Sequence, residues 1–493
     1  NLGAGTDSIA VYLSGNANHS ATYTNVSNIE GITYALVSGN STVTGTLVDG
    51  NFVNVTDAAI SAASVSGVVT INASAEDDSS FKITGGTGAD VLTGADTTTL
   101  GDTINGGLGA DTIDGSKGGD TLTGGAGADV FDYNAVADSS GSTPDTITDF
   151  ISGTDSFNVE LDYSTNNSGV TVAADVTTAK AGSSAVQESF TGNRGQTVYD
   201  TDNSQLVINY NADNLISALD YKINVNAGGT AATTVADSDI VWRITTGSGG
   251  DIISTTSAAN NVVSSGAGND SITMAAGDDD VTVTTGTNTI IGNGGGDQID
   301  AGTGITTVRY DDADDGHAAV VLTDISDITD DVTGVTIANN VYADKNDYVE
   351  GLTVGTDFVK IGGTLKASLE ASGAAVITSG TDLTTVDYNA TGIIILDIAD
   401  NGGSMKLAAD GADAWLDISD VSTRFNTEII AQNAAGGDEI LFTIEQSSGD
   451  ATGLYYLKFG ATNDTGQIAA TDTIALLAVF ADDDFAVGTV TVT

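Results

Sequence analysis

The 493-residue sequence contains no cysteine, one proline, two histidines and only 13 lysines and arginines. The lack of cysteine excludes disulfides and cysteine-ligated zinc sites, and two histidines leave almost nothing for histidine catalysis or histidine-ligated zinc. So few basic residues exclude nucleic acid as a default partner, because phosphate binding needs a basic surface. No run of about 18 apolar residues occurs, so no transmembrane insertion is expected.

Aspartate and glycine are abundant instead. Of the 67 acidic residues only nine are Glu, and the formal net charge is -54. This excess of the shorter carboxylate indicates residues placed in turns, where they ligate a cation or bond nearby backbone. The 62 glycines with a single proline point to repeated tight turns between short strands. The 40 % of hydrophobic residues is enough to build packed cores.

A nine-residue repeat, G-G-x-G-x-D-x-U-x with U a large apolar residue, runs through residues 85–132. Its aspartates are separated by 12, 9, 9 and 9 residues, and the apolar residue follows two positions later each time. The repeat aspartates are Asp90, Asp102, Asp111, Asp120 and Asp129. The unit 97–105 lacks the leading glycines, so we expect its loop to ligate a cation less well.

A second, more degenerate array covers residues 246–309. Its polar position holds Asp251, Asn260, Asp270, Asp279, Asn288, Asp297 and Thr306. Its apolar position holds Ile253, Val262, Ile272, Val281, Ile290, Ile299 and Val308. All seven are β-branched, which predicts a buried column of strand residues. Because Asn and Thr offer only neutral oxygen, we expect weaker or empty cation sites at their units.

Each unit supplies a six-residue turn and a three-residue strand, and two units make one 18-residue turn of a solenoid. Loops 18 residues apart then stack, and a cation between them can take carboxylate oxygens and loop carbonyls, which suits Ca²⁺. The stacked pairs are Asp102/Asp120, Asp111/Asp129, Asp251/Asp270 and Asp279/Asp297, with Asp90 on the side of Asp111. Gly-Asp turns also form without metal. Stacked carboxylates without a cation would, however, repel one another.

These nonapeptides resemble the RTX repeats of calcium-binding β-rolls in type I-secreted bacterial proteins. The resemblance implies an extracellular protein that binds several Ca²⁺ ions. It implies as metal ligands Asp90, Asp102, Asp111, Asp120, Asp129, Asp251, Asp270, Asp279 and Asp297, with Asn288 as a neutral member. The C-terminal stretch 471–493, apolar and then acidic with a Thr/Val tail, resembles a type I secretion signal. An ordinary pair of terminal strands is the alternative.

The segments after the two arrays, 145–159 and 347–361, share an opening Asp, a Gly-Thr-Asp and matching apolar positions. The chain therefore reads as two copies of a roll followed by a cap. We predict an all-β fold of tandem parallel β-rolls with strand-rich caps and one short helix at 419–433. The segments are a β-rich, solenoid-like 1–84, roll 85–132, cap 133–245, roll 246–309 and cap 310–493. Cap strands are expected at 196–210, 392–398, 439–445 and 453–460.

No catalytic constellation is evident: H-E-x-x-H and G-x-S-x-G are both absent, so we expect no enzyme. His317, beside the acidic run 311–315, is interpreted as an exposed loop residue. The composition resembles RTX-type surface-layer proteins of Gram-negative bacteria such as the caulobacters. That resemblance implies a cell-surface protein whose partners are copies of itself in a calcium-dependent lattice and a cell-surface polysaccharide. The alternative is an RTX adhesin or matrix protein that binds a glycan or a surface.

Overall fold

The computed structural model describes residues 8–310 apart from short gaps, and beyond residue 310 it describes mainly separate strands. The gaps before residue 310 are 15–17, 24–28, 39–41, 50–51, 141, 167, 181–189, 191–192, 212–216, 218 and 227–234. The described chain is β-structure, and its one helical segment within these residues is the 3-10 helix Asp237–Asp239. The predicted all-β class is confirmed. Within the same residues, no helix is long and apolar enough to cross a membrane.

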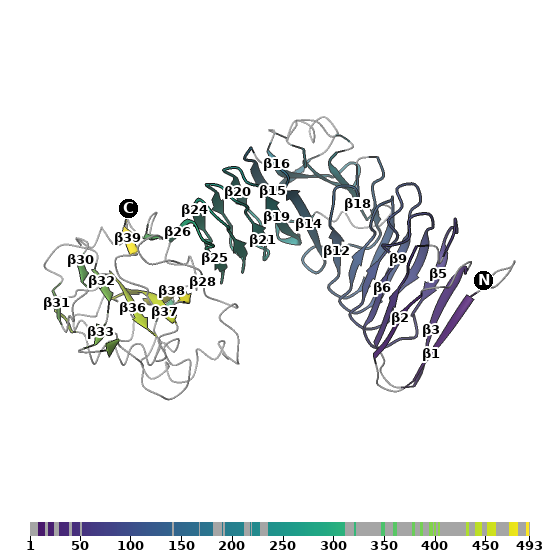
Figure 1. The fold of residues 1–493 in the computed structure, drawn as a ribbon, viewed down its shortest axis with the longest axis horizontal. Helices are drawn as coiled ribbons and strands as arrows, with labels where there is room; N and C mark the ends of the chain where they lie inside the picture. The colour runs from purple at the N-terminus through teal and green to yellow at the C-terminus, as the bar shows by residue number, and fades with distance from the viewer. Residues whose placement is uncertain are drawn as a thin grey trace. The chain divides into compact units, whose positions relative to one another are not determined.

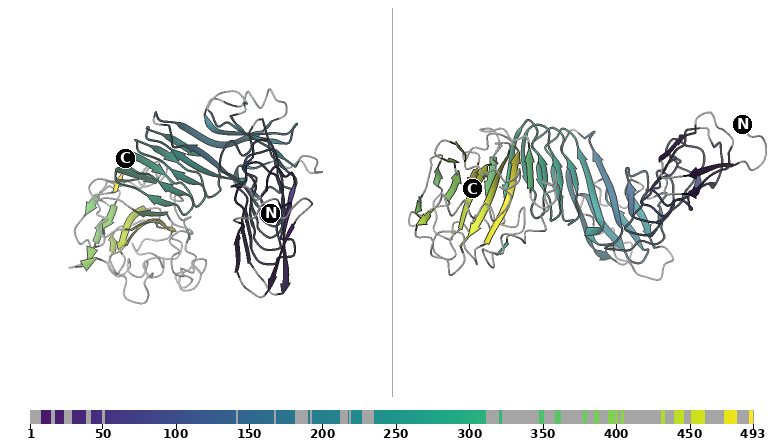
Figure 2. Two further views of the ribbon diagram at one scale, coloured as in Figure 1. Left: turned by 45° about the vertical axis from the view of Figure 1, so that its right-hand side comes forward. Right: turned by 90° about the horizontal axis from the view of Figure 1, so that it is seen from below.

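The chain divides into two compact units: Asn1–Asp162 with Thr171–Ile244, and Tyr163–Val170 with Thr245–Thr493. In unit 1, successive strands alternate between two sheets, so each pairs in parallel with the strand after next (Figure 1, Figure 2). One sheet holds β1 (Ser8–Ser14), β3 (Gly31–Ser38), β5 (Ala58–Ser61), β7 (Phe81–Thr84), β9 (Thr103–Leu108), β11 (Thr121–Ala126) and β13 (Thr146–Ile147). The other holds β2 (Asn18–Thr22), β4 (Thr42–Thr46), β6 (Val69–Asn72), β8 (Val91–Thr93), β10 (Thr112–Asp114), β12 (Val130–Tyr133) and β14 (Ser156–Tyr163).

The core of this roll consists of two columns of apolar side chains, one from each sheet. The columns contain Ile83, Ile104, Leu122 and Ile147 on one side and Leu92, Ile113, Phe131 and Phe157 on the other, all 0–1 % exposed. Parallel register places Ile83 beside Ile104 and Leu92 beside Ile113. Burial of each such side chain contributes about 1.5–3 kcal/mol, so the apolar position of the nonapeptide is what holds the two thin sheets together.

The roll of unit 1 ends in a cap of antiparallel strands. β16 (Arg194–Asp200), β17 (Gln205–Ile208) and β18 (Tyr221–Val225) form an antiparallel meander, and β18 pairs in parallel with β13. Aromatic rings fill the end of the roll, where Phe150 stacks on Phe157 with ring centroids 4.6 Å apart. The meander covers a sheet edge that would otherwise present unpaired backbone groups.

Unit 2 repeats the alternation of strands. One sheet contains β20 (Ile252–Thr255), β22 (Ser271–Thr273), β24 (Thr287–Ile291), β26 (Ile305–Tyr310), β29 (Phe358–Ile361) and β39 (Val490–Val492). The other contains β21 (Val262–Ser264), β23 (Asp280–Thr282), β25 (Gln298–Asp300), β28 (Asp347–Glu350) and β38 (Thr473–Ala481). β37 (Ala451–Lys458) and β36 (Glu439–Glu445) extend this second sheet in antiparallel fashion.

The cap strands expected from the sequence are present. β16 and β17 fall largely within the predicted stretch 196–210, and β32 (Ile394–Asp397) lies within the predicted 392–398. β36 matches the predicted 439–445, and β37 overlaps the predicted 453–460. The helix predicted at 419–433 falls outside the described residues except at its end. There, β35 (Ile430–Gln432) pairs with β31 (Thr385–Asp387), so strand pairing replaces helix at these positions. The segment boundaries at 85, 133, 246 and 310 stay a prediction.

Candidate metal centre

The repeat aspartates of unit 1 form two ladders, each with one carboxylate per turn of the roll. Every ladder aspartate is buried just before a strand, and its Oδ1 accepts a backbone N–H from the preceding turn. In the first ladder, Phe81 N–H donates to Asp102 Oδ1 at 2.6 Å, Asp102 N–H to Asp120 at 2.6 Å, and Asp120 N–H to Asp145 at 2.8 Å. The carboxylates therefore bind the turns of the solenoid to one another.

The second ladder of unit 1 lies along the other sheet. Here Val69 N–H donates to Asp90 Oδ1 at 2.7 Å, Asp90 N–H to Asp111 Oδ1 at 2.7 Å, Asp111 N–H to Asp129 Oδ1 at 2.9 Å, and Asp129 N–H to Asp155 Oδ1 at 3.1 Å. The predicted stacking of Asp90, Asp111 and Asp129 on one side, and of Asp102 and Asp120 on the other, is confirmed.

Unit 2 carries two ladders of the same kind. On one, Val170 N–H donates to Asp251 at 2.7 Å, Asp251 to Asp270 at 2.9 Å, and Asp270 to Asn288 Oδ1 at 3.1 Å. On the other, Asn261 N–H donates to Asp279 at 2.7 Å, and Asp279 N–H to Asp297 at 3.0 Å. The predicted pairs Asp251/Asp270 and Asp279/Asp297 are stacked as expected.

One assignment in this array is wrong by a single residue. Asn261, not Asn260, holds the ladder position, and it is fully buried. Val263 is likewise buried in the core column at 1 % exposure, whereas Val262 is 41 % exposed. The extra residue of this repeat therefore precedes the unit instead of following it. The cause is the local sequence Asn-Asn-Val-Val, which fits the template in either register.

The second carboxylate oxygen, Oδ2, differs in its surroundings from one ladder residue to the next. At Asp90 and Asp102 it accepts a loop N–H, from Gly86 at 2.5 Å and Ala95 at 2.6 Å. Other ladder Oδ2 atoms are buried and have no hydrogen-bond partner within the described residues, among them those of Asp111, Asp120, Asp251 and Asp279. A buried oxygen without a donor is strongly unfavourable, so these atoms fit a cation.

The electrostatics of the ladders lead to the same conclusion. Burial raises the pKa of Asp102 and of Asp279 to about 7, and that of Asp111 to about 6. Burial and the neighbouring Asp120 carboxylate together raise the pKa of Asp145 well above its usual range. Without a counter-charge, Asp102, Asp145 and Asp279 would be protonated for much of the time at neutral pH. A bound cation allows them to stay ionised inside the roll.

The leading glycine of the nonapeptide makes room for that second oxygen. A Cβ on Gly85 would lie 2.6 Å from Asp90 Oδ2, and one on Gly115 would lie 2.5 Å from Asp120 Oδ2. Both distances are shorter than real Cβ contacts allow. Glycine is therefore required there because the loop wraps closely around the carboxylate of its own unit.

Two ladder residues were not among the predicted ligands. Asp145 and Asp155 extend the ladders past the nonapeptides into the segment 145–159. Both open the triplet Asp-x-large apolar, as Asp-Thr-Ile and Asp-Ser-Phe, and Ile147 and Phe157 enter the core columns. This triplet, without the glycines, was the signal available in the sequence.

The described residues contain no group of three or more His, Cys, Asp or Glu side chains that can hold a metal ion. An ion beside a ladder carboxylate would take its further oxygens from backbone carbonyls of the loops or from water. Oxygen-only ligation from irregular backbone suits Ca²⁺, which tolerates variable geometry. The assignment of individual aspartates and of Asn288 as ligands stays a prediction.

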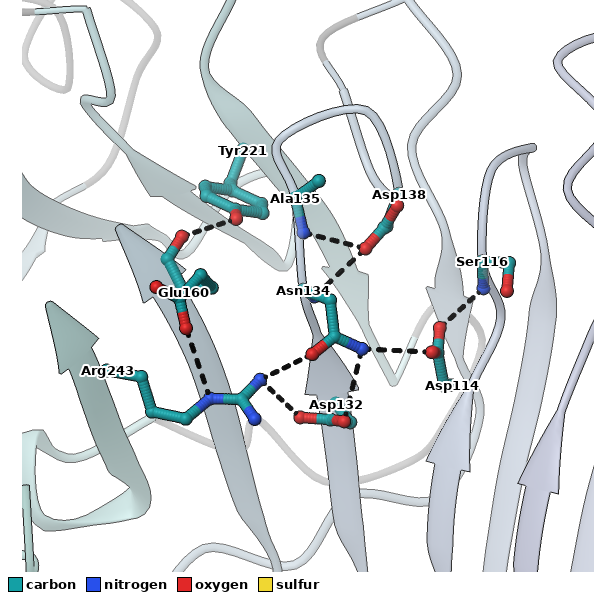
Figure 3. A network of polar contacts seen from close by, with 9 residues as sticks. All are labelled: Asp114, Ser116, Asp132, Asn134, Ala135, Asp138, Glu160, Tyr221 and Arg243. Carbon is teal, nitrogen blue, oxygen red and sulfur yellow. Dashed lines mark hydrogen bonds and ion pairs between the residues drawn. The ribbon is translucent and has the colours of Figure 1, made fainter. Parts of the chain in front are cut away.

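A separate network of ion pairs and hydrogen bonds lies beside the first roll (Figure 3). Arg243, on β19 (Ile240–Thr246), pairs with Asp132 Oδ1 at 2.7 Å and with Glu160 at 3.7 Å. It also donates to Asn134 Oδ1 at 2.9 Å, while the Asn134 amide donates to Asp114 at 3.0 Å. One of the chain's few cations thus pairs with Asp132, at the ninth position of its repeat, and with Glu160 on β14.

The fold and the ladders define a parallel β-roll protein built from nonapeptides. Residues 275–308 match the family model of the RTX calcium-binding nonapeptide repeat, described as four copies, and residues 46–227 match that of the peptidase M10 serralysin C-terminal region. No curated protein matches the chain. The chain thus carries nonapeptide repeats of the RTX calcium-binding type, and these imply multiple Ca²⁺ ions. Such repeats and the serralysin C-terminal region are typical of type I-secreted extracellular proteins.

Proposed function

We propose that this protein is a structural surface-layer protein that folds on binding Ca²⁺ and then assembles with copies of itself on the cell surface. The observation that carries the proposal is the row of buried ladder carboxylates whose second oxygens lack a donor. Such a row is unfavourable in a chain without metal and favourable once each oxygen faces a cation. The fold therefore depends on the ion, as a calcium-triggered building block requires.

Folding follows export in this scheme. Where free Ca²⁺ is low, the net charge of -54 and the stacked carboxylates disfavour the compact state. Extracellular modules bind Ca²⁺ at about 10⁻⁴–10⁻³ M. Because only the folded roll presents the ladder, the free energy of binding becomes free energy of folding. The C-terminal stretch 471–493 supplies the type I secretion signal in this proposal.

Assembly uses the acidic surface that remains after the ladders are filled. With 67 acidic and 13 basic residues, like-charged subunits repel one another, and Ca²⁺ between surface carboxylates removes that repulsion. The proposal includes no catalysis. The serralysin match is to the C-terminal region of those peptidases, and the H-E-x-x-H motif is absent from the chain.

Two measurements on the purified chain test the proposal. Circular dichroism should show β-structure with millimolar Ca²⁺ and its loss with excess chelator; equal β-content in both would overturn calcium-dependent folding. Electron microscopy of the same samples should show ordered sheets or tubes with Ca²⁺ alone. Folded particles that stay dispersed would overturn the surface-layer role in favour of an adhesin, for which glycan binding would then be assayed.

A further inference from the structure

Three ladder positions of unit 2 carry a neutral side chain instead of aspartate: Asn261, Asn288 and Thr306. The Asn261 amide nitrogen donates to Ala259 O at 2.8 Å, to Ser257 O at 3.3 Å and to Asp279 Oδ1 at 3.0 Å. Since all three partners can only accept, the nitrogen must be the atom that faces them. The amide thus directs a donor at its own loop carbonyls.

Thr306 repeats this arrangement with a hydroxyl. Its Oγ1 donates to the carbonyl of Ala301, five residues earlier in the same loop, at 2.9 Å. Carbonyls of the loops are the oxygens that a cation at an aspartate position would need beside the carboxylate. A carbonyl that already accepts a side-chain hydrogen bond is a poorer ligand for that cation.

Asn288 differs in detail but leads to the same result. Its Oδ1 accepts the backbone N–H of Asp270 at 3.1 Å, so the oxygen has the role of Oδ1 in an aspartate. The amide NH₂ then takes the place of the second carboxylate oxygen, and this nitrogen is buried with no hydrogen-bond partner within the described residues. A donor in that place repels a cation.

We propose that Asn261, Asn288 and Thr306 make metal-free positions in the ladders of unit 2, where a side-chain donor stands in for Ca²⁺. The inference rests on the proposed calcium-dependent fold and refines it. In the first roll, Asp111 and Asp120 present a second oxygen without a hydrogen-bond donor to a cation, whereas three of the seven ladder positions of the second roll, at Asn261, Asn288 and Thr306, are metal-free. Of the residues 275–308 that match the calcium-binding repeat, only the units of Asp279 and Asp297 then bind the ion.

The test is the number of Ca²⁺ ions bound by the full chain at saturating calcium, measured by equilibrium dialysis and elemental analysis. Asn288→Asp breaks no side-chain donor bond and adds an oxygen, so it should raise the number by about one ion. Asn261→Asp should do the same, and should also fold only at higher Ca²⁺ because it loses the bonds to Ser257 and Ala259. Asp279→Asn is the matched control and should lower the number.

Unchanged ion numbers in both Asn→Asp variants would overturn the inference, as would a lower number in Asn261→Ala or Asn288→Ala. If Asn261→Asp fails to fold at any Ca²⁺ concentration, Asn288→Asp alone decides, because it removes no bond. A wild-type chain that binds no Ca²⁺ would overturn the proposed function itself. The two failures are therefore distinguishable in one experiment.

Discussion

The backbone N–H of Asp102 donates to Asp120 Oδ1 across 2.6 Å, joining residues 18 apart on successive turns of the roll. Asp120 Oδ2, on the same carboxylate, is buried and has no hydrogen-bond partner within the described residues. One oxygen of this carboxylate thus links two turns through a hydrogen bond, and the other is available to a cation. The contact between successive turns and the binding of calcium therefore depend on the same carboxylate.

Asp120→Ala should therefore raise the Ca²⁺ concentration at the folding midpoint far more than Asn288→Ala does. The first variant removes a ligand and leaves the Asp102 N–H buried without its acceptor, at a cost of about 1–3 kcal/mol. Since ~1.4 kcal/mol is a factor of ten, we expect a shift of roughly tenfold. Asn288→Ala also leaves a backbone N–H, that of Asp270, without its acceptor, but it removes no carboxylate ligand, so its midpoint should shift less. Calcium titrations followed by circular dichroism measure both, and equal midpoints would contradict the site assignment.

Gly115→Ala and Gly119→Ala form a matched pair within one loop. A Cβ at Gly115 would lie 2.5 Å from Asp120 Oδ2, whereas the nearest atom to a Cβ at Gly119 is Pro144 O at 3.6 Å. We expect Gly115→Ala to destabilise the calcium-loaded chain by about 1–3 kcal/mol through overpacking. Gly119→Ala should be neutral or stabilise by up to ~1 kcal/mol. Thermal unfolding in Ca²⁺ separates them, and similar melting temperatures would refute the role of the leading glycine.

Much of the fold was predictable because the nonapeptide specifies both the buried strand residue within each unit and the stacking of units 18 residues apart. The large apolar residue two places after each aspartate predicted the core columns, and the spacing of 18 predicted which carboxylates stack. The register error at Asn260 arose because two Asn and two Val stand side by side. Only pairing with Asp279, on the next turn, selects Asn261. Local sequence carries no information about that choice.

The other differences between the sequence prediction and the structure also have physical causes. At Asp145 and Asp155 the Gly-Gly pair that opens the nonapeptide is lost, so a search for the full repeat motif does not find them. They hold their places because Ile147 and Phe157 continue the core columns. The end of the predicted helix became β35 because Ile430 and its neighbours pair with Thr385–Asp387. A non-local strand partner outweighs helical periodicity there.

The pH dependence of stability should change sign between chelator and calcium. Burial raises the pKa of Asp102 and Asp279 to about 7 in the folded chain, against about 3.9 for an unfolded aspartate. The folded state then binds more protons, so this contribution to stability is complete below about pH 4 and is lost as the pH rises through about 7. In chelator, where the chain is expected to be unfolded at pH 8, β-structure should therefore be regained as the pH falls to 5.5.

In saturating Ca²⁺ the trend should reverse, because protons compete with the ion for the same oxygens. Asp279→Asn, which cannot titrate, should show a weaker pH dependence in chelator than the wild type. The measurement is circular dichroism over this pH range in chelator and thermal unfolding over the same range in saturating Ca²⁺. If acid destabilised the chelated chain as it does the loaded one, the ladder carboxylates would not be the groups that take up the protons.

Arg243→Ala should destabilise unit 1 by about 1–3 kcal/mol, because charged hydrogen-bonding groups are worth that much when partly buried. The Arg243 side chain is 28 % exposed and pairs at 2.7 Å with Asp132, itself 17 % exposed. Arg243→Lys should destabilise unit 1 by less than Arg243→Ala but still measurably, since one ammonium cannot reproduce the planar fork that reaches Asp132, Asn134 and Glu160.

Lys117→Ala is the control. The side chains of its ion pair, Lys117 and Asp96, are 36 % and 41 % exposed, so a loss of only ~0–1 kcal/mol is expected. Urea unfolding in Ca²⁺ compares the three variants, and an Arg243→Ala effect no larger than that of Lys117→Ala would show that the network in Figure 3 adds nothing to stability.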